Sequence, residues 1–135
     1  MVFRFPQKVL FKHCDPAGIV FYPRYFEMLN DAVEALFADV LLWPFEDIHP
    51  TGGVPTVAID VVFKAPSRHG DQLILEIALK SLGRTSLGLQ TTALAGDQVR
   101  FVANHTLVLV DGTGRPAPWP DAMRQKITEQ MDTPI

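Results

Sequence analysis

Asp15 is the residue whose type and surroundings best suit chemistry. It lies within the sequence HCDP of residues 13–16, and Gly18 and an apolar run separate it from a predicted helix that begins at Pro23. A carboxylate beside a helix N-terminus can attack a carbonyl group, while free backbone N–H groups stabilise the charge that develops on oxygen. An Asp before Pro also starts turns by accepting backbone hydrogen bonds, so a purely structural role for Asp15 stays open.

The same stretch favours neither a catalytic trio nor a metal site. Neighbouring side chains of an extended chain point to opposite sides, so His13, Cys14 and Asp15 cannot converge on one reacting atom. Cys14 is predicted to be a small buried or turn-adjacent residue. The histidines are scattered without the spacing of a zinc site, and we expect no metal: His13, His49, His69 and His105. His105, in an apolar segment, is predicted to be a hydrogen-bonded structural residue.

The composition indicates one folded domain over residues 1–135. The chain is 47% hydrophobic and 20% charged, with a net charge of −3, so it has no global basic field for nucleic acid or an anionic membrane. One cysteine allows no internal disulfide, and the N-terminus lacks the pattern of a signal peptide. The apolar stretches are too short to span a bilayer. We expect a cytoplasmic protein that binds neither nucleic acid nor membranes.

Hydrophobic periodicity predicts a strand, one long helix and four further strands. Apolar residues recur at three and four from Tyr25 to Val40, and Pro23 suits the first helical turn. Val2 to Lys12 alternates loosely and contains Pro6, which suits an edge strand. Turns typical of antiparallel hairpins separate the later strands: Val54 to Lys64, Gln72 to Leu82, Thr85 to Ala95 and Gln98 to Val110.

Two connecting regions complete this prediction. Phe45 to Gly53 is expected to hold a short helix or a loop that covers a substrate, and Asp121 to Gln130 a short terminal helix. A helix of about 17 residues is about 25 Å long, and strands of about 11 residues, about 35 Å long, can cover its apolar stripe. The sequence therefore predicts an α+β fold in which a five-stranded antiparallel sheet wraps around one long helix.

The stretch from Asp15 to Pro23, DPAGIVFYP, followed by Tyr25, resembles the signature of the 4-hydroxybenzoyl-CoA thioesterase family of the hot-dog fold. Weaker features follow in the matching order over most of the chain: Gly53-Val54-Pro55, Phe63, Asp71 and Gly83-Arg84-Thr85-Ser86. The resemblance implies hydrolysis of an acyl-CoA thioester without a cofactor, coenzyme A being part of the substrate.

The resemblance also implies roles for individual residues. Asp15 would be the catalytic carboxylate, as nucleophile or as base for water, and the Tyr22 backbone N–H would polarise the thioester carbonyl. Gly18 is expected to permit close backbone approach in this catalytic segment. Residues that bind coenzyme A phosphates are implied near the third-to-fourth strand turn and in the C-terminal segment: Arg84, Thr85, Ser86 and Arg115.

An acyl-binding wall is expected from apolar residues for which core packing is the alternative: Phe21, Tyr25, Leu29, Val54 and Phe63. Asn30 stands where the 4-hydroxybenzoyl enzyme directs an acidic residue toward the phenol, and an amide there would select differently. The related short-chain enzymes carry a histidine near the helix start, where this chain has Pro23. An aromatic and a short-chain acyl group therefore both stay open.

Two other activities are alternatives. Hot-dog hydratases and dehydratases usually use a histidine near the helix start, and no histidine lies between Cys14 and Phe45. A non-catalytic module that binds acyl-CoA or an acyl carrier would keep the cleft without chemistry. Hot-dog domains usually pair their sheets edge to edge, so we expect a homodimer at minimum and a homotetramer as the full assembly.

Overall fold

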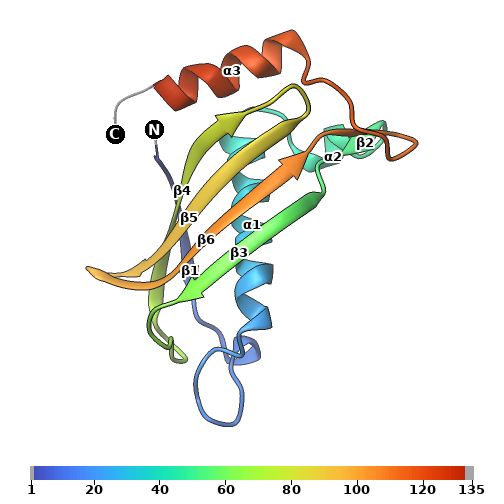
Figure 1. Ribbon diagram of the computed structural model, residues 1–135. Helices are drawn as coiled ribbons and strands as arrows, with labels where there is room; N and C mark the ends of the chain where they lie inside the picture. The colour runs from blue at the N-terminus through green and yellow to red at the C-terminus, as the bar shows by residue number, and fades with distance from the viewer. Residues whose placement is uncertain (1, 133–135) are drawn as a thin grey trace.

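A curved antiparallel sheet wraps around one long helix in the computed structural model, which describes residues 2–132 (Figure 1). The sheet has the strand order β1-β4-β5-β6-β3. Its strands are β1 (Val2–Lys8), β3 (Thr56–Phe63), β4 (Gln72–Leu82), β5 (Ser86–Ala95) and β6 (Gln98–Val108). The predicted five-stranded α+β architecture is therefore confirmed.

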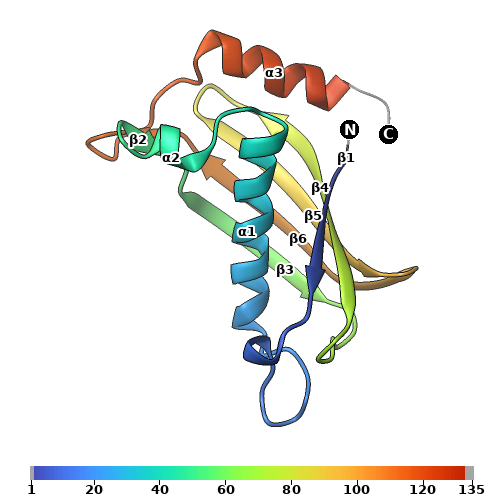
Figure 2. The same ribbon diagram turned by 180° about the vertical axis from the view of Figure 1, so that it is seen from behind.

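Helix α1 (Pro23–Asp39) lies on the concave side of the sheet, as the view from behind shows (Figure 2). Pro23 occupies its first turn, as predicted, because proline has no N–H to lose there. The helix ends at Asp39, and Leu42 just beyond it has a φ of 55°. The buried side chains recur at helical spacing and pack against the sheet: Tyr25, Met28, Leu29, Ala32, Val33, Leu36 and Phe37.

The position of β3 differs from a simple succession of hairpins. β3 does not pair with β4, which follows it in sequence, but crosses to the opposite edge and pairs antiparallel with β6. β1 forms the other edge beside β4, which accommodates Pro6 as predicted. Most of β3 is exposed on both faces, so its free edge is the most open part of the sheet.

Shorter elements adjust the predicted boundaries. The first strand ends at Lys8, not Lys12, because the chain turns into a 3-10 helix, η1 (Phe11–His13). The His13 Nδ1 accepts a 2.9 Å hydrogen bond from the Leu10 N–H at this turn. The connector contains α2 (Phe45–Ile48) and β2 (Gly52–Gly53), which pairs with β7 (Val110–Asp111). Because β2 and β7 form a separate pair, β3 begins at Thr56 instead of Val54, and β6 ends at Val108 instead of Val110.

Helix α3 (Asp121–Asp132) lies across one end of the sheet (Figures 1 and 2). Met123 and Ile127 are buried, and the Arg124 Nη2 donates a 2.8 Å hydrogen bond to the Gly83 carbonyl in the β4–β5 turn. α3 thereby covers the end of the sheet opposite the start of α1. None of the helices within residues 2–132 has the length and hydrophobicity that a membrane crossing requires.

Candidate active site

The segment Cys14–Val20, which we call the Asp15 loop, extends beyond the first turn of α1 (Figures 1 and 2). Its ends meet as an antiparallel bridge between Cys14 and Val20. The Asp15 N–H donates to the Ile19 carbonyl at 3.0 Å, and the Gly18 N–H donates to the Asp15 carbonyl at 2.9 Å. Backbone hydrogen bonds therefore close the loop that carries Asp15, and this loop leads into the start of α1.

The Asp15 carboxylate has one engaged and one open oxygen. Its Oδ1 accepts a 2.9 Å hydrogen bond from the Ala17 N–H, which is the turn role that the sequence left open. Its Oδ2 has no hydrogen-bond partner among residues 2–132. Asp15 is partly exposed in one protomer. One oxygen orients the group and the other remains open to a substrate.

Gly18 is required for its backbone conformation and not for a close approach. Its φ is +80°, in the left-handed region that other residues adopt at a cost. No atom lies within 4 Å of where a Cβ would stand at this position. Nothing in one protomer approaches Gly18 closely, so its constraint there comes from the dihedral angle, and close approach to a bound substrate stays a prediction.

The start of α1 presents a free donor beside the Asp15 loop. Tyr22 is the N-cap residue and Pro23 has no N–H, while the Phe21 N–H already donates to the His13 carbonyl at 2.9 Å. Within the described part of the chain, the Tyr22 N–H has no acceptor. The Tyr22 side chain is 58% exposed and makes no capping hydrogen bond. The backbone donor predicted to polarise a carbonyl is thus available.

An aromatic cluster joins the helix start to the end of β3. The ring centroids are 5.7 Å apart for Phe21 and Tyr22, 6.1 Å for Tyr22 and Phe63, and 5.8 Å for Tyr25 and Phe63. Tyr25 also contacts Phe101 at 4.8 Å and is only 4% exposed, so core packing accounts for its side chain. Phe21 and Phe63 are about half exposed, so this end of the cluster is open to solvent in one protomer.

A cleft of about 810 Å³ lies between α1, α2, β6 and the first part of β3; we call it the central cleft. This volume is within the range of sites that bind small molecules. Of the five residues of the predicted acyl wall, Leu29 and Val54 line the cleft, and Asn30, the other predicted substrate contact, lines it as well. The remaining three predicted residues lie in the aromatic cluster: Phe21, Tyr25 and Phe63. Asp15 is not part of the cleft lining.

The central cleft also has polar lining residues that the sequence analysis did not assign to the site. They are Glu34 from α1, Glu46 and His49 from α2, and His105 from β6. His105 is only 6% exposed, and its Nδ1 is buried without a hydrogen-bond partner among the described residues. The prediction of a hydrogen-bonded structural histidine is therefore wrong. Its place between the buried Ala103 and Leu107 was the signal that it faces inward.

Burial lowers the pKa of the His105 imidazole from its ordinary value of 6.5, because desolvation disfavours the charged ring. His13, which is buried beside the Asp15 loop, has a pKa that is lowered chiefly by burial and then by the charge of Lys12. Both rings are therefore neutral at pH 7. Within residues 2–132 no three side chains of His, Cys, Asp or Glu are grouped in a way that could hold a metal ion.

The profile of the thioesterase-like superfamily matches residues 9–127. The chain belongs to this superfamily. The match includes the Asp15 loop, α1 and all of the central cleft. The predicted relationship to thioesterases is thus confirmed at the level of the family.

Individual thioesterases are similar to this member of the superfamily. A 4-hydroxybenzoyl-CoA thioesterase from Pseudomonas sp. (strain CBS-3) is 31% identical over 83 residues, which are 59% of this chain and 59% of that enzyme. A thioesterase from Thermus thermophilus, solved with coenzyme A and Zn, is 26% identical, with a TM-score of 0.84 over 98% of this chain and 96% of that one.

A third protein confirms the predicted hot-dog fold. Slr0204 from Synechocystis, a 1,4-dihydroxy-2-naphthoyl-CoA thioesterase, has a TM-score of 0.88, with coverage of 99% of this chain and 100% of that chain. Its sequence identity is 19%, so this likeness concerns the fold alone. The alignment with the Pseudomonas enzyme spans less than two thirds of either chain.

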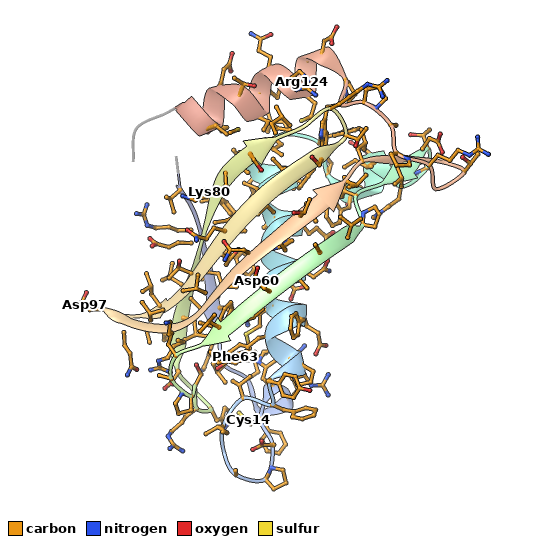
Figure 3. The ribbon with its side chains drawn as sticks, in the orientation of Figure 1. Cys14, Asp60, Phe63, Lys80, Asp97 and Arg124 are labelled. Atoms are coloured by element: carbon orange, nitrogen blue, oxygen red, sulfur yellow. The ribbon has the colours of Figure 1, made fainter. Side chains whose placement is uncertain are left out.

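The residues implied to bind coenzyme A lie far from Asp15 in one protomer of this superfamily member. Arg84 and Thr85 lie in the β4–β5 turn and Ser86 begins β5. The Arg84 carbonyl accepts hydrogen bonds from Trp119 and Arg124. Figure 3 shows Arg124 and Cys14 at opposite ends of the molecule. The exposed Arg115 follows β7, the strand that pairs with β2. One protomer therefore does not bring these basic residues to the Asp15 loop.

A largely buried arginine anchors the Asp15 loop from the sheet. The Val20 N–H donates to the Ser67 carbonyl at 2.8 Å, which ties the loop to the turn formed by residues 66–71. The Arg100 Nη1 donates into that turn, to the Pro66 carbonyl at 3.0 Å, the Ser67 Oγ at 3.1 Å and the Asp71 Oδ2 at 2.7 Å. This link was not predicted, because Arg100 is 29 residues from Asp71.

Proposed function

We propose that this chain hydrolyses acyl-CoA thioesters and that Asp15 is the catalytic carboxylate. The observation that carries the proposal is that an open carboxylate oxygen, Asp15 Oδ2, and an unengaged donor, the Tyr22 N–H, both belong to the segment that leads into α1. The Pseudomonas relative acts on a CoA thioester by name, and the Thermus structure contains coenzyme A. Both support the same substrate class here.

In the proposed chemistry, the Asp15 carboxylate and the Tyr22 N–H act on the same thioester carbonyl group. The thioester oxygen accepts a hydrogen bond from the Tyr22 N–H, and the α1 dipole stabilises the negative charge that develops on it. In one route Asp15 attacks the carbonyl carbon, coenzyme A leaves as the thiolate, and water hydrolyses the mixed anhydride. In the other, Asp15 takes a proton from the water that attacks. Both routes yield a carboxylic acid and coenzyme A without a cofactor.

A homodimer across the β3 edge would complete the site. Val57, Ile59 and Val62 are exposed on β3, and an unpaired strand with such side chains favours the addition of a second strand. A two-fold axis beside β3 would turn the Asp15 loop of one protomer toward the end of the other that carries Arg84. A homotetramer would follow from two such dimers.

The assembly is tested by light scattering coupled to size-exclusion chromatography. Val62→Lys places a charge on the β3 edge and is expected to shift the mass toward the monomer and abolish turnover. Ala122→Lys, on the exposed surface of α3, is the control and is expected to keep the mass of the assembly and the turnover of the wild type. A monomeric wild type with full activity would contradict the proposed assembly.

The function is tested with a panel of acyl-CoA thioesters and a thiol-reactive chromophore that reports free coenzyme A. Asp15→Asn keeps the side-chain volume and removes the charge, so turnover is expected to fall at least about a hundredfold. Asp97→Asn, in the exposed turn between β5 and β6, is the matched control (Figure 3). Full turnover by Asp15→Asn would rule out this role. Loss of enoyl absorbance, or tight binding without thiol release, would favour a hydratase or a binding module.

A further inference from the structure

His13 joins three segments that meet at the base of the Asp15 loop. Its imidazole Nδ1 accepts the 2.9 Å hydrogen bond from the Leu10 N–H, just after β1. Its backbone N–H donates to the Leu10 carbonyl at 3.0 Å, and its carbonyl accepts from the Phe21 N–H at 2.9 Å. The residue is only 5% exposed. One buried residue therefore connects the end of β1, the Asp15 loop and the residue before the N-cap of α1.

These contacts support both groups that are proposed to act on the thioester. Asp15 follows His13 by two residues in the chain. The Phe21 N–H is occupied by the His13 carbonyl. The Tyr22 N–H, which is left open, belongs to the next residue along the chain. A displacement of about 1 Å at a reacting group can reduce a rate about a hundredfold. The position of the His13 ring should therefore matter for turnover.

The hydrogen bond from Leu10 requires one protonation state of the His13 ring. An imidazole nitrogen accepts a hydrogen bond only while it carries no proton, so the neutral ring has its proton on the Nε2. A protonated imidazole has an N–H at both positions. It would direct the Nδ1–H toward the Leu10 N–H, and the contact would become repulsive. The turn therefore holds its shape only with a neutral His13.

The surroundings of the His13 ring favour this neutral form. Burial is the largest cause that lowers the pKa of His13 from its ordinary value of 6.5, and the charge of Lys12 in η1 is the next. From α1, Arg24 also lowers this pKa, whereas Glu27 and Asp31 raise it. The nearer influence of Glu27 is offset because it forms a 2.8 Å ion pair with Arg24. The ring is therefore neutral at pH 7 and becomes protonated in weak acid.

We propose that His13 is a positioning residue for Asp15 and the Tyr22 N–H, and that it acts only while its imidazole is neutral. The proposal rests on the proposed thioesterase function and adds a proton-dependent control of the same site. The sign follows from the two states of the turn. His13 takes its ordinary pKa of 6.5 when the turn is open and a lower one when it is closed. The closed turn therefore loses stability as the pH falls below 6.5.

His13→Asn tests this role, because an amide oxygen can accept the same hydrogen bond and does not titrate. Hydrolysis is followed from pH 7.5 to pH 5 through the loss of thioester absorbance, which needs no thiol reagent. At pH 7.5 the variant is expected to keep kcat within about twofold of the wild type. The ratio of the wild-type kcat to that of the variant is expected to fall about threefold or more by pH 5. Asp15 is the same in both proteins, so its own titration cancels in this ratio.

His13→Leu removes the acceptor at every pH. Its kcat at pH 7.5 is expected to be about tenfold below that of the wild type, with KM changed less than about twofold, because the ring supports the reacting groups without binding the substrate. His69→Asn is the matched control, since His69 is exposed and its ring contacts Phe11 of the same turn at 6.0 Å. It should keep the wild-type pH profile. Parallel profiles for the wild type and His13→Asn, or an equal change in His69→Asn, would overturn the proposal.

A measurement on the wild type decides the question if the variants do not fold. Amide hydrogen exchange of Leu10 and Phe21 is measured by NMR and expressed as protection factors, which removes the intrinsic pH dependence of exchange. Both protection factors should fall together as the His13 ring becomes protonated. A loss at Leu10 alone would overturn the proposal, because the ring would then support only the turn after β1. If the wild type hydrolyses no thioester of the panel, the proposed function fails, while hydrogen exchange still tests the link from His13 to the start of α1.

Discussion

The Asp15 loop and the central cleft lie along the same helix, α1, yet different interactions form them. The loop is shaped by backbone hydrogen bonds among residues 14–20, and its one conformational requirement is the positive φ of Gly18. The cleft is shaped by side chains from α1, α2, β3 and β6, which the sheet brings together. The loop can therefore be specified by a short motif, whereas the cleft depends on how distant elements pack.

Arg100 is the exception that connects the loop to the tertiary structure. Its side chain is 12% exposed, and it holds the 66–71 turn, which in turn holds Val20. Arg4 forms a similar contact with Glu76 at 2.8 Å, but the Arg4 side chain is 60% exposed. These two ion pairs have the same chemistry and differ in burial. We expect the ion pair of Arg100, and not the exposed ion pair of Arg4, to affect the position of Asp15.

The largest effect is expected from Arg100→Met. Removing the guanidinium leaves the Pro66 carbonyl and the Ser67 Oγ without this donor and leaves Asp71 with the Arg68 N–H alone, so the free energy of unfolding should fall by about 2 kcal/mol. Turnover should fall as well, because the anchor of the Asp15 loop is weakened. Urea denaturation and the thiol-release assay measure the two effects. Arg4→Met should lower the free energy of unfolding by less than about 0.5 kcal/mol, because its ion pair is solvated. Equal losses would contradict the comparison.

A smaller effect is expected in the pH dependence of the free energy of unfolding, and it comes from the same ion pair between Arg100 and Asp71. The hydrogen bonds from Arg100 and the Arg68 N–H hold the pKa of the Asp71 carboxyl below its ordinary value of 3.8. The carboxylate therefore stabilises the folded state above about pH 3.8, and this contribution is lost as the pH falls through the lower folded pKa. Urea midpoints measured from pH 6 to pH 2 should fall less steeply in Arg100→Met than in the wild type.

The pH comparison has its own internal control. The pKa values of Glu27 and Asp111 are also lowered, by a hydrogen bond from Arg24 and by hydrogen bonds from Thr113, respectively. Both groups are the same in Arg100→Met, so their contributions cancel in the difference between the two proteins. Parallel curves for wild type and variant would show that Arg100 does not affect the titration of Asp71.

The smallest effect is expected from Gly18→Ala. An alanine at a φ of +80° should lower the free energy of unfolding by about 1 kcal/mol, because its Cβ clashes locally with its own backbone. Gly112→Ala is the control, since Gly112 lacks a positive φ and its nearest neighbour would be 3.6 Å from the added Cβ. Thermal unfolding compares the two. If Gly18→Ala costs no more than the control, the Asp15 loop tolerates more backbone variation than its hydrogen bonds indicate.

Local sequence patterns predicted the bounds of the helices and strands better than they predicted which strands pair. The period of α1 and the short turns between β4, β5 and β6 are properties of contiguous sequence, and these elements formed within a residue or two of the predicted bounds. The pairing of β3 with β6 was not predicted, because the hydrophobic pattern of a strand does not specify which strand lies beside it in the sheet. The first strand was predicted too long, since the 3-10 turn at Phe11–His13 depends on a hydrogen bond to the His13 side chain.

The candidate site divides in the same way. The position of Asp15 and Tyr22 at one helix start followed from nine consecutive residues. The separation of Arg84 from Asp15 did not, because it depends on which end of the sheet each turn occupies. His105 was assigned a structural role, since sequence alone does not reveal whether a buried ring finds a partner.

By itself, the sequence determined the long helix, the antiparallel strands and the motif that brings a carboxylate to the helix start. These features depend on backbone dihedral angles and hydrogen bonds between residues close in the chain. Only the tertiary structure decided which residues share the central cleft, which arginine supports the Asp15 loop and which edge strand stays open. Those outcomes depend on how the sheet curves over α1, and that curvature brings together side chains from residues 26 to 107.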